Sequence, residues 1–564
     1  MSKWPAVAKR APYRRMVVAV VSVCAVAGLT VPAFARASGG VSSPSTYLVG
    51  AAQRSINPTP QMLAGHDFYL GGYGVTDGKV AGTVAIPGET GRLATGILGD
   101  GIHVRALAVS DGRHTLELAE IETQGYFAAY RAGPYGIEDI RKDAAAQISA
   151  LAAHRSGARG PALDAGSILV DSDHSHGGPD TVGVWGGVPT SYLQLVHDRT
   201  VAALVAAYEQ MRPATLSYGM AHAGVVGEAA RYPSPDPLLT NQFSNDPNNQ
   251  VVDDQLRVLQ ARDRRTGNVI VTYVNFSGHP TVLDADNTLV TGDYPQVLDA
   301  MLAQAYGGIG FDQVATLGRT QPNRGSCAPA TPDGGAQLAC LSAYAGRVLA
   351  RARQALAAAQ PLTGPPVVAM NSYLVEDPGT GPALLALLYA GGAIGAPVER
   401  SLASPWITGN VVGTTTFSGR IGDLLLSGGP GEMWPQITAE VQADVPARGY
   451  LNIGTAGDFL GYFIYPLSAY PEPIRRTVLS GNPPPSGDTC SGIHSPVGCP
   501  SPLDNDTFSF NLSTTIGARV TCSLLRGAGD VFAHDPSRFR SLEPACALFP
   551  ADLLRPAGAD TTAG

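Results

Sequence analysis

The stretch ILVDSDHSHGGP, residues 168–179, joins an apolar run to a polar turn that carries two histidines. The apolar run predicts a buried strand, and the glycines with Pro179 predict a turn. Residues i and i+2 of an extended segment face the same way, so His174 and His176 share one face at the strand end. Two such imidazoles form half of a metal site, usually zinc when a carboxylate is added, or one ligand beside a substrate contact. The alternative is a pair of loop histidines with no shared role.

Strands and helices alternate on both sides of this stretch. Where residues alternate or run apolar, we predict strands at 104–109, 115–121, 167–170 and 269–276. Where apolar residues recur with helical spacing, we predict helices at 137–155, 191–210 and 294–306. The alternation predicts an α/β fold with mixed α+β layers, and the length of the chain allows a sizeable core.

The N-terminal segment has the pattern of a signal peptide. Basic residues at 9–15 precede an apolar run at 16–29, and the small residues Ala33 and Ala35 follow as a cleavage site. We therefore predict a signal peptide at residues 1–35 and a secreted, extracellular mature chain. The export route is either an ordinary secretory (Sec) route or, because of two adjacent arginines, the twin-arginine route. The apolar run is too short for a comfortable span, so no transmembrane anchor is expected in the mature chain.

The charge of the chain argues against some classes of partner. The formal net charge is −8, and loss of five basic residues with the signal leaves 33 Lys and Arg against 46 Asp and Glu, about −13. No basic stripe is visible, which argues against nucleic acid and against electrostatic docking on an anionic membrane. The sequence gives no indication of the oligomeric state.

Six cysteines remain after Cys24 leaves with the signal, an even number in an oxidising compartment. They fall in local pairs, so we predict the disulfides Cys327–Cys340, Cys490–Cys499 and Cys522–Cys546. After about residue 480 the chain becomes rich in Pro, Ser, Gly and Cys. This change of composition predicts a short disulfide-tied C-terminal extension at 480–564.

Three further turns carry polar residues at the ends of apolar runs. His279 lies in Ser-Gly-His-Pro-Thr, Thr320 and Gln321 lie in a polar turn at 317–323, and Glu432 ends Gly-Gly-Pro-Gly-Glu. Taken singly, His279 is as consistent with a capped loop histidine as with a ligand. A lone glutamate in a Pro-Gly turn is usually solvated.

Together these turns resemble the zinc-dependent catalytic domain of the neutral and alkaline ceramidases. That family's Thr-His-Thr-His-Ser-Gly-Pro, His-Pro-Thr and Pro-Gly-Glu motifs are matched by residues 173–179, 279–281 and 430–432. Its Asp-Ile-Thr-Pro, Gly-Tyr-Gly, Asn-Arg-Ser-Pro and Asn-x-Tyr-x-x-Tyr motifs are matched more loosely by residues 55–58, 72–74, 230–233 and 458–462. The resemblance covers residues 47–475 and implies a ceramidase-like zinc hydrolase domain there.

The resemblance implies a Zn²⁺ site with four ligands: His174, His279, Glu432 and Tyr462. Two neutral imidazoles and a carboxylate leave a coordination position for water, whose pKa zinc lowers from 15.7 to about 7. His176 and Arg231 would then face the substrate carbonyl and the oxyanion that develops on it. A donor at that position lowers the barrier by about 2.7–4 kcal/mol.

The sequence departs from the family in the polar turn. The family has Gly-Asp-Val-Ser-Pro-Asn, whereas residues 318–323 place Arg319 at the Asp position and Gln321 at the Ser position. Gln321 is no nucleophile, but it donates and accepts hydrogen bonds, and Thr320 is a hydroxyl one position away. We therefore expect Thr320 and Gln321 to contact substrate.

These observations predict a secreted zinc amidohydrolase that cleaves an acyl amide, either a small molecule or an N-acyl sphingoid (ceramide-like) lipid. One alternative is a zinc esterase or hydrolase of a non-lipid substrate on the same scaffold. Another is a catalytically silent exported binding protein, favoured by the replacements at Arg319 and Gln321. The apolar segment 382–394 is either a buried helix or a pocket for an acyl chain.

Overall fold

The computed structural model describes residues 45–73, 91–154, 161–183, 185–241, 251–378, 411–463, 512, 516–532 and 554–556. The predicted signal peptide, the apolar segment 382–394 and Cys490, Cys499 and Cys546 lie outside the described residues. Within the described ranges, no helix combines the length and the apolar character that a membrane crossing requires.

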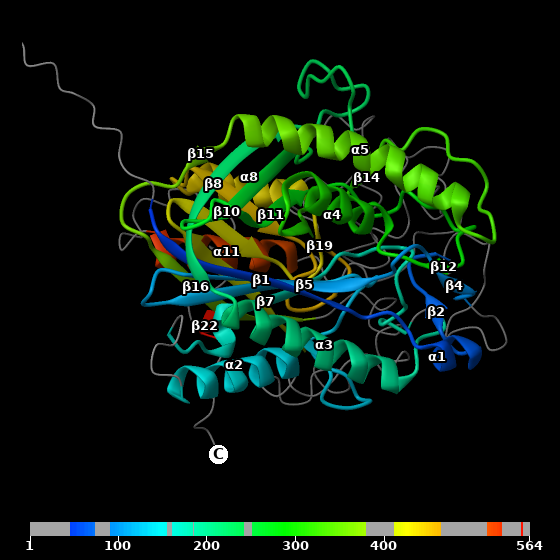
Figure 1. Cartoon of the computed structure of the whole chain (residues 1–564), viewed down its shortest axis with the longest axis horizontal. Coiled ribbons are helices and arrows are strands. Elements are labelled where there is room, and N and C mark those ends of the chain that lie inside the picture. The colour runs from blue at the N-terminus through cyan, green and yellow to red at the C-terminus, as the bar shows by residue number, and fades with distance from the viewer. Residues whose placement is uncertain are drawn as a thin grey trace, which may run out of the picture. The chain divides into compact units, whose positions relative to one another are not determined.

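A nine-stranded sheet forms the centre of the fold (Figure 1). Its strand order is β13-β11-β10-β8-β1-β5-β6-β7, and β15 pairs with β8. The strands are β1 (Tyr47–Ser55), β5 (His103–Ser110), β6 (Thr115–Ile121), β7 (Ile168–Ser172), β8 (Arg212–His222), β10 (Gln255–Asp263), β11 (Val269–Phe276), β13 (Ile309–Val314) and β15 (Gln360–Pro361). The strands at the two ends of this order, β13 and β7, lie close together. Gln313 Nε2 on β13 donates a hydrogen bond of 2.6 Å to Asp171 Oδ1 on β7. The ends of β7, β11 and β13 therefore lie in one region.

Helices cover both faces of this sheet, which confirms the predicted mixed α/β layers. On one face α2 (Ile137–His154) packs against α3 (Thr190–Glu209), and α3 packs on β1 and β5. On the other, α4 (Asp293–Tyr306) and α5 (Gly335–Ala357) pack together and contact β13 and β8 (Figure 1). Apolar residues recur along α3 with the period of a helix, so they share one face. Leu193, Val196 and Leu204 on this face are buried.

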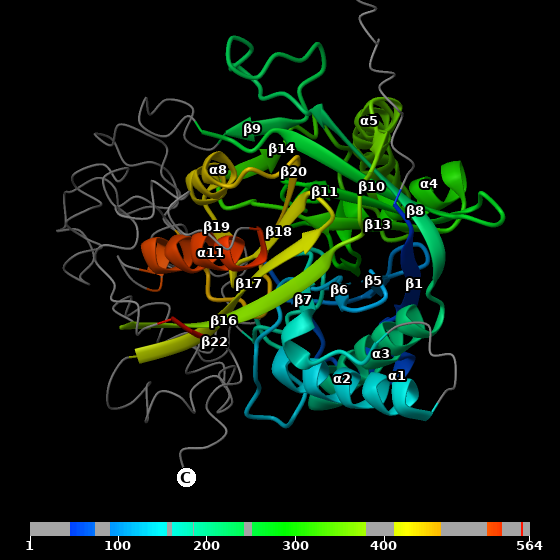
Figure 2. The ribbon, with the colours of Figure 1, turned by 90° about the vertical axis from the view of Figure 1, so that its left-hand side faces the viewer.

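A second sheet of five strands has the order β20-β18-β17-β16-β22. Its strands are β16 (Val368–Pro378), β17 (Val411–Ile421), β18 (Leu424–Gly428), β20 (Gly449–Ile453) and β22 (Leu554–Pro556). The helices α8 (Pro435–Asp444) and α11 (Ile516–Phe532) pack against each other, and α11 lies along β16 and β17 (Figure 2).

The predicted C-terminal extension contributes to this second layer. Leu524, Leu525 and Ala528 of α11 are buried in the same core cluster as residues of α2 and α3, and β22 pairs with β16. The close approach needs a small residue, because a Cβ on Gly527 would lie 2.3 Å from Ser418 Oγ. The described part of the extension is thus packed into the main body instead of standing apart from it.

Short elements complete the described fold. They are α1 (Pro60–Ala64), η1 (Ala165–Ser167), β2 (Tyr69–Leu70), β3 (Arg92–Leu93), β4 (Gly96–Ile97), β9 (Leu239–Asn241), β12 (Leu289–Val290), β14 (Thr320–Pro322), β19 (Glu432–Met433) and β21 (Tyr462–Phe463). They form the two-stranded pairs β2-β3, β4-β12, β9-β14 and β19-β21.

The predicted Cys327–Cys340 disulfide is present, with its Cα atoms 5.5 Å apart. It ties the segment before α5 to the first turns of that helix. Cys522 is also disulfide-bonded, and its predicted partner Cys546 lies outside the described residues.

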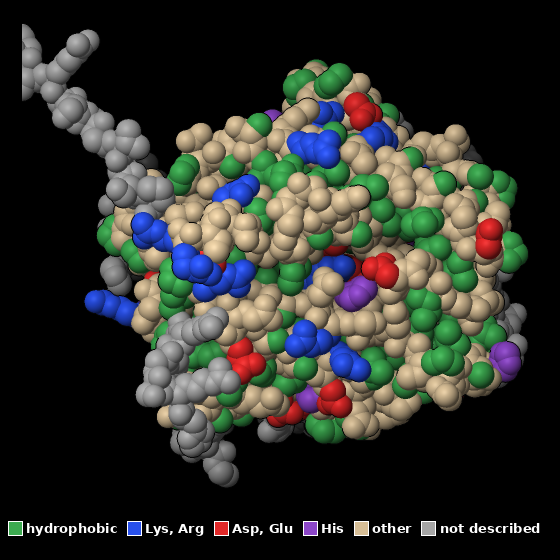
Figure 3. Space-filling model, in the orientation of Figure 1, with side chains coloured by type: hydrophobic (Ala, Val, Ile, Leu, Met, Phe, Trp, Pro, Cys, Tyr) green, Lys and Arg blue, Asp and Glu red, His purple; other side chains and the backbone are tan. Residues whose placement is uncertain are grey.

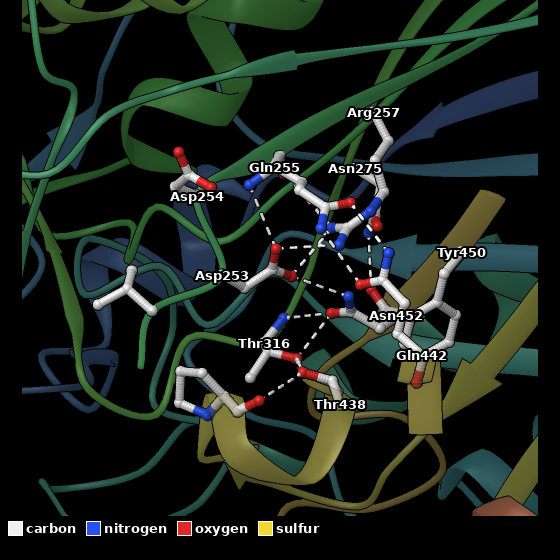
Figure 4. Close-up of polar contacts among 12 residues, drawn as sticks. Asp253, Asp254, Gln255, Arg257, Asn275, Thr316, Thr438, Gln442, Tyr450 and Asn452 are labelled. Atoms are coloured by element: carbon white, nitrogen blue, oxygen red, sulfur yellow. Dashed lines mark hydrogen bonds and ion pairs between the residues drawn. The ribbon is translucent and has the colours of Figure 1, made fainter. Parts of the chain in front are cut away.

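A buried polar junction joins the two sheets (Figure 4). Asp253 accepts two bonds of 2.9 Å from the Arg257 guanidinium and one of 2.9 Å from Asn452 Nδ2 on β20. Asn275 Nδ2 on β11 donates to the Asn452 carbonyl at 2.8 Å, and the Thr316 amide donates to Asn452 Oδ1 at 2.7 Å. Asn452 therefore fixes β20 against the end of β11. The predicted metal ligand His279 follows this end of β11.

Candidate metal centre

Three histidine side chains meet where β7 and β11 end. His174 and His176 follow β7, and His279 follows β11. The Nε2 atoms of His174 and His176 are 3.2 Å apart, and those of His176 and His279 are 3.3 Å apart. A main-chain bond of 3.1 Å from the His176 amide to the Pro280 carbonyl ties the two turns together. The three side chains form a group that could hold a metal ion.

Glu432 joins this cluster from the second half of the chain. Its Oε1 lies 3.4 Å from His174 Nε2 and its Oε2 lies 4.0 Å from His279 Nε2. The Glu432 amide donates to the Gly461 carbonyl at 2.8 Å, and a Cβ on Gly431 would lie 2.4 Å from that carbonyl oxygen. Glycine at 431 therefore allows β19 to lie against β21, where Tyr462 pairs with Glu432 in register.

The donor set fits a tetrahedral metal ion. Zinc bonds to nitrogen and oxygen are 2.0–2.2 Å long, so the ligand atoms of a tetrahedral site lie about 3.3–3.5 Å apart. The distances of 3.2 Å between His174 and His176, 3.3 Å between His176 and His279 and 3.4 Å between His174 and Glu432 are close to this value, and that between His279 and Glu432 is longer, at 4.0 Å. Imidazole and carboxylate are also ligand types that zinc prefers in proteins.

The histidines have the uncharged form that a metal ligand requires. Burial lowers the pKa of His279 to about 4, and the Leu317 carbonyl acts in the opposite direction. Burial also lowers the pKa of His174 and of His176 well below the usual value, and the neighbouring histidines add to this effect. The Nδ1–H of His174 donates to the Gln124 carbonyl at 2.7 Å, which leaves its Nε2 lone pair directed at the cluster.

His176 is held from the opposite side by the predicted Gly-Tyr-Gly segment. Its ring packs on Gly72, where φ is +88° and a Cβ would lie 2.3 Å from the imidazole Cγ. The Tyr73 ring contacts it edge-on, with centroids 4.9 Å apart. The Arg92 guanidinium donates to the carbonyls of His176, Gly71 and Asn287, and it also lies over the Tyr73 ring. Only glycine at position 72 leaves room for the ring.

The two residues of the polar turn differ in their surroundings. Thr320 is fully buried, and its hydroxyl donates to the Ser277 carbonyl at 2.6 Å. Gln321 is partly buried, and its Oε1 accepts a bond of 2.6 Å from the hydroxyl of Thr281, two residues after His279. Gln321 is thus connected to the histidine turn, whereas the Thr320 hydroxyl is directed into the backbone of that turn.

Arg231 lies in an exposed turn, with its guanidinium 6.0 Å from the centroid of the Tyr232 ring. In the ranges that the structure describes, no hydrogen bond or ion pair joins Arg231 to the histidines. Its assignment to the substrate carbonyl remains a prediction from the resemblance.

Arg319, which stands at the family's Asp position, is fully buried. Its Nη2 donates to Asn241 Oδ1 at 2.9 Å, and its guanidinium lies 5.2 Å from the centroid of the Trp434 ring. Trp434 follows Glu432 by two residues, so Arg319 packs against the segment that carries the carboxylate. This contact and those of Gln124 and Arg92 are not predictable from the sequence pattern, because the residues that they join are far apart in the sequence.

Comparison with known proteins gives a fold and no sequence match. No family model matches the chain, and no curated protein matches it. Among solved structures, neutral ceramidase from Pseudomonas aeruginosa has 16% identity and a TM-score of 0.54, over 85% of this chain and 75% of that one. A ceramidase complexed with C2 has 15% identity and a TM-score of 0.58, over 87% and 76%. The chain therefore has the fold of the neutral ceramidases, as its sequence motifs predicted.

Proposed function

We propose that this chain is a zinc-dependent hydrolase of acyl amides. The observation that carries the proposal is one cluster in which Glu432 lies 3.4 Å from His174 and 4.0 Å from His279, with His176 within 3.3 Å of both histidines. We assign His174, His279 and Glu432 as the protein ligands and Tyr462, beside Glu432, as a candidate fourth. Three protein ligands leave the open position that catalytic zinc requires.

When bound, zinc supplies a water of lowered pKa and polarises a carbonyl oxygen. We assign His176 to the acyl carbonyl of the substrate, as the resemblance implies, and its Nε2 lies beside the assigned ligands, 3.2 Å from that of His174 and 3.3 Å from that of His279. Its position depends on Gly72 and on the bonds from Arg92 to its carbonyl. Charge develops on the substrate oxygen in the transition state, and a donor at that point stabilises it more than the ground state.

The attacking group in this proposal is water, not a side chain. Gln321 stands where the family has serine and forms no covalent intermediate, but its amide is held beside His279 by the bond from Thr281. We assign Gln321 and Arg231 to substrate contacts, whereas the buried Thr320 hydroxyl supports the backbone of the His279 turn. Arg319 packs against Trp434 in this chain, so its role is to support the segment of Glu432.

We further propose an exported enzyme acting on an N-acyl lipid of the ceramide type. The signal-like segment at 1–35 supports export, and the likeness in fold to two ceramidases supports the substrate class. Basic and acidic side chains are interspersed on the face seen in Figure 3.

Two measurements test the proposal. Elemental analysis of protein purified with zinc present should give one metal ion per chain. A panel of N-acylsphingosines, N-acyl amino acids and acyl esters should then show amide hydrolysis that a chelator abolishes and zinc restores. Protein without metal would contradict the site. Hydrolysis of esters alone would favour the esterase, and bound metal without any hydrolysis would favour the silent binding protein.

A further inference from the structure

The loop at residues 454–457, which follows β20, reaches two other strands and the glycine turn before Glu432. We call it the junction loop. Its four backbone amides donate, in chain order, to the carbonyls of Val314, Gly431, Gly429 and Val170. The bond lengths are 3.2, 3.1, 2.8 and 2.8 Å. The loop therefore contacts β13, the glycine turn before Glu432, and the strand β7 that leads to His174.

Within this loop, Thr455 bonds to both ligand segments. Its hydroxyl donates to the Ser172 carbonyl at 2.5 Å, and its amide donates to the Gly431 carbonyl at 3.1 Å. Ser172 precedes His174 by two residues, and Gly431 precedes Glu432 by one. Thr455 is fully buried, so no solvent competes for these bonds.

The backbone of Thr455 adopts a conformation that threonine rarely takes. Its φ is +48°, and the φ of His174 is +61°. A β-branched residue in the left-handed region is strained, and such strain persists only where the surroundings require it. Glycine would adopt this conformation without strain, as Gly457 does at +80°. What threonine adds over glycine at this position is the hydroxyl that bonds to Ser172.

We infer that Thr455 is a positioning residue of the metal centre. Its two bonds fix the separation between the backbone of the His174 turn and that of the Glu432 turn, and so the separation of two ligand atoms 3.4 Å apart. The inference rests on the proposed function, because it concerns the affinity of the proposed metal site. Removing a group that orients ligands typically lowers metal affinity about 10–100-fold.

The test compares Thr455→Val, Thr455→Ser and Thr455→Gly with the parent. The affinity for Zn²⁺ is measured by competition with a chromophoric chelator, and the stability of each metal-free protein is measured by urea unfolding. Valine keeps the shape but loses the hydroxyl, so affinity should fall about 10–100-fold. Serine keeps the hydroxyl and should stay within about threefold of the parent.

A matched control separates positioning from a general loss of stability. Thr200 in α3 is also fully buried, and its hydroxyl donates to the Val196 carbonyl at 2.7 Å within the helix. Thr200→Val should lower the stability of the metal-free protein without changing its affinity for Zn²⁺. If Thr455→Val fails to fold, Thr455→Gly replaces it, because glycine accepts the left-handed backbone and also lacks the hydroxyl.

The outcomes distinguish this inference from the proposed function. A parent that binds no Zn²⁺ would overturn both. A parent that binds Zn²⁺, together with hydroxyl-free variants that bind it equally well, would overturn only the role of Thr455. An equal loss of affinity in Thr455→Val and Thr200→Val would also overturn it, since the effect would then follow stability alone.

Discussion

At the scale of single residues, the two histidines of the His-x-His pair have different surroundings. His174 donates through Nδ1 to the Gln124 carbonyl and lies 3.4 Å from Glu432, which is the arrangement of a ligand with an oriented ring. His176 has Gly72, Tyr73 and Arg92 around it. The separate roles that we propose for them follow from these contacts.

Substitution of each histidine tests those roles. His174→Ala should remove both metal and hydrolysis, because it takes away a ligand. His176→Ala should retain the metal and lower kcat about 10²–10³-fold, since its contact strengthens in the transition state. Metal content and single-turnover rates measured on the same preparations decide this. Loss of metal from His176→Ala would make His176 the fourth ligand instead.

A second prediction concerns Glu117 in β6, which is fully buried. Neither of its carboxylate oxygens has a hydrogen-bond partner among the described residues, and burial raises its pKa well above the usual range. The folded state therefore holds a proton that the unfolded chain releases above pH 4–5. Stability falls as pH rises from this range toward the higher pKa of the folded state, because the unfolded state binds fewer protons there.

Glu117→Met should therefore raise the free energy of unfolding at pH 7 by about 1–3 kcal/mol, the cost of an unsatisfied buried polar group. The gain should be larger at pH 8 than at pH 5. Urea unfolding at both pH values measures it, with Glu117→Gln as a polar control that does not titrate. A gain that is the same at both pH values would show that Glu117 is not protonated in the fold.

The sequence predicts which residues form the cluster better than it predicts which residues hold them in position. His174, His176, His279 and Glu432 all follow apolar strands, which is why their convergence could be expected. The supporting contacts of Gln124, Arg92 and Thr455 are with main-chain carbonyls from distant segments. Carbonyls are the same in every residue, so no side-chain pattern identifies them in advance.

At the scale of helices and strands, the sequence predicts the first sheet and its helices well. The strands β5, β6, β7 and β11 and the helices α2, α3 and α4 begin and end within three residues of the predicted positions. Their signal is local, because each has a regular period of apolar residues. The sequence does not predict α11, because its helical stretch lies within a Pro-, Ser- and Gly-rich segment. In the fold, β16 and β17 bury this helix.

The disulfide at the start of α5 gives a prediction at this scale. Its two cysteines are 13 residues apart, and a closed loop of this size stabilises a fold by roughly 3 kcal/mol through the unfolded state. Replacing Cys327 and Cys340 together with alanine should lower the free energy of unfolding by about that amount. Urea unfolding of the variant and of the parent, both without reductant, measures this. No change in stability would show that the bridge does not constrain the unfolded chain.

At the scale of the whole molecule, the proposed metal site joins the two sheets. His174 and His279 belong to turns of the nine-stranded sheet, whereas Glu432 follows β18 of the five-stranded one. The junction of Asn452 with Asp253 and Asn275 makes a second connection between the same layers (Figure 4).

Metal removal should therefore lower the stability of the whole chain. Zinc at about 100 times its Kd should add about 2.7 kcal/mol to the free energy of unfolding, provided that the unfolded chain does not bind it. Thermal unfolding with a chelator and with added zinc measures the difference. His174→Ala should show no such difference, and an equal response in that variant would mean that zinc binds elsewhere.

The wide separation of the ligands along the chain has a consequence for when the metal is acquired. Strands β7, β11 and β18 must all be in place before His174, His279 and Glu432 can meet, so no early fragment of the chain forms the site. Pairings this distant in sequence form late in folding. A chain that crosses a membrane unfolded would take its ion only from the far side, whereas a chain that crosses folded would carry an ion from its place of synthesis. Because nitrogen and oxygen ligands bind several divalent ions, the compartment of folding would help to decide which ion the protein holds.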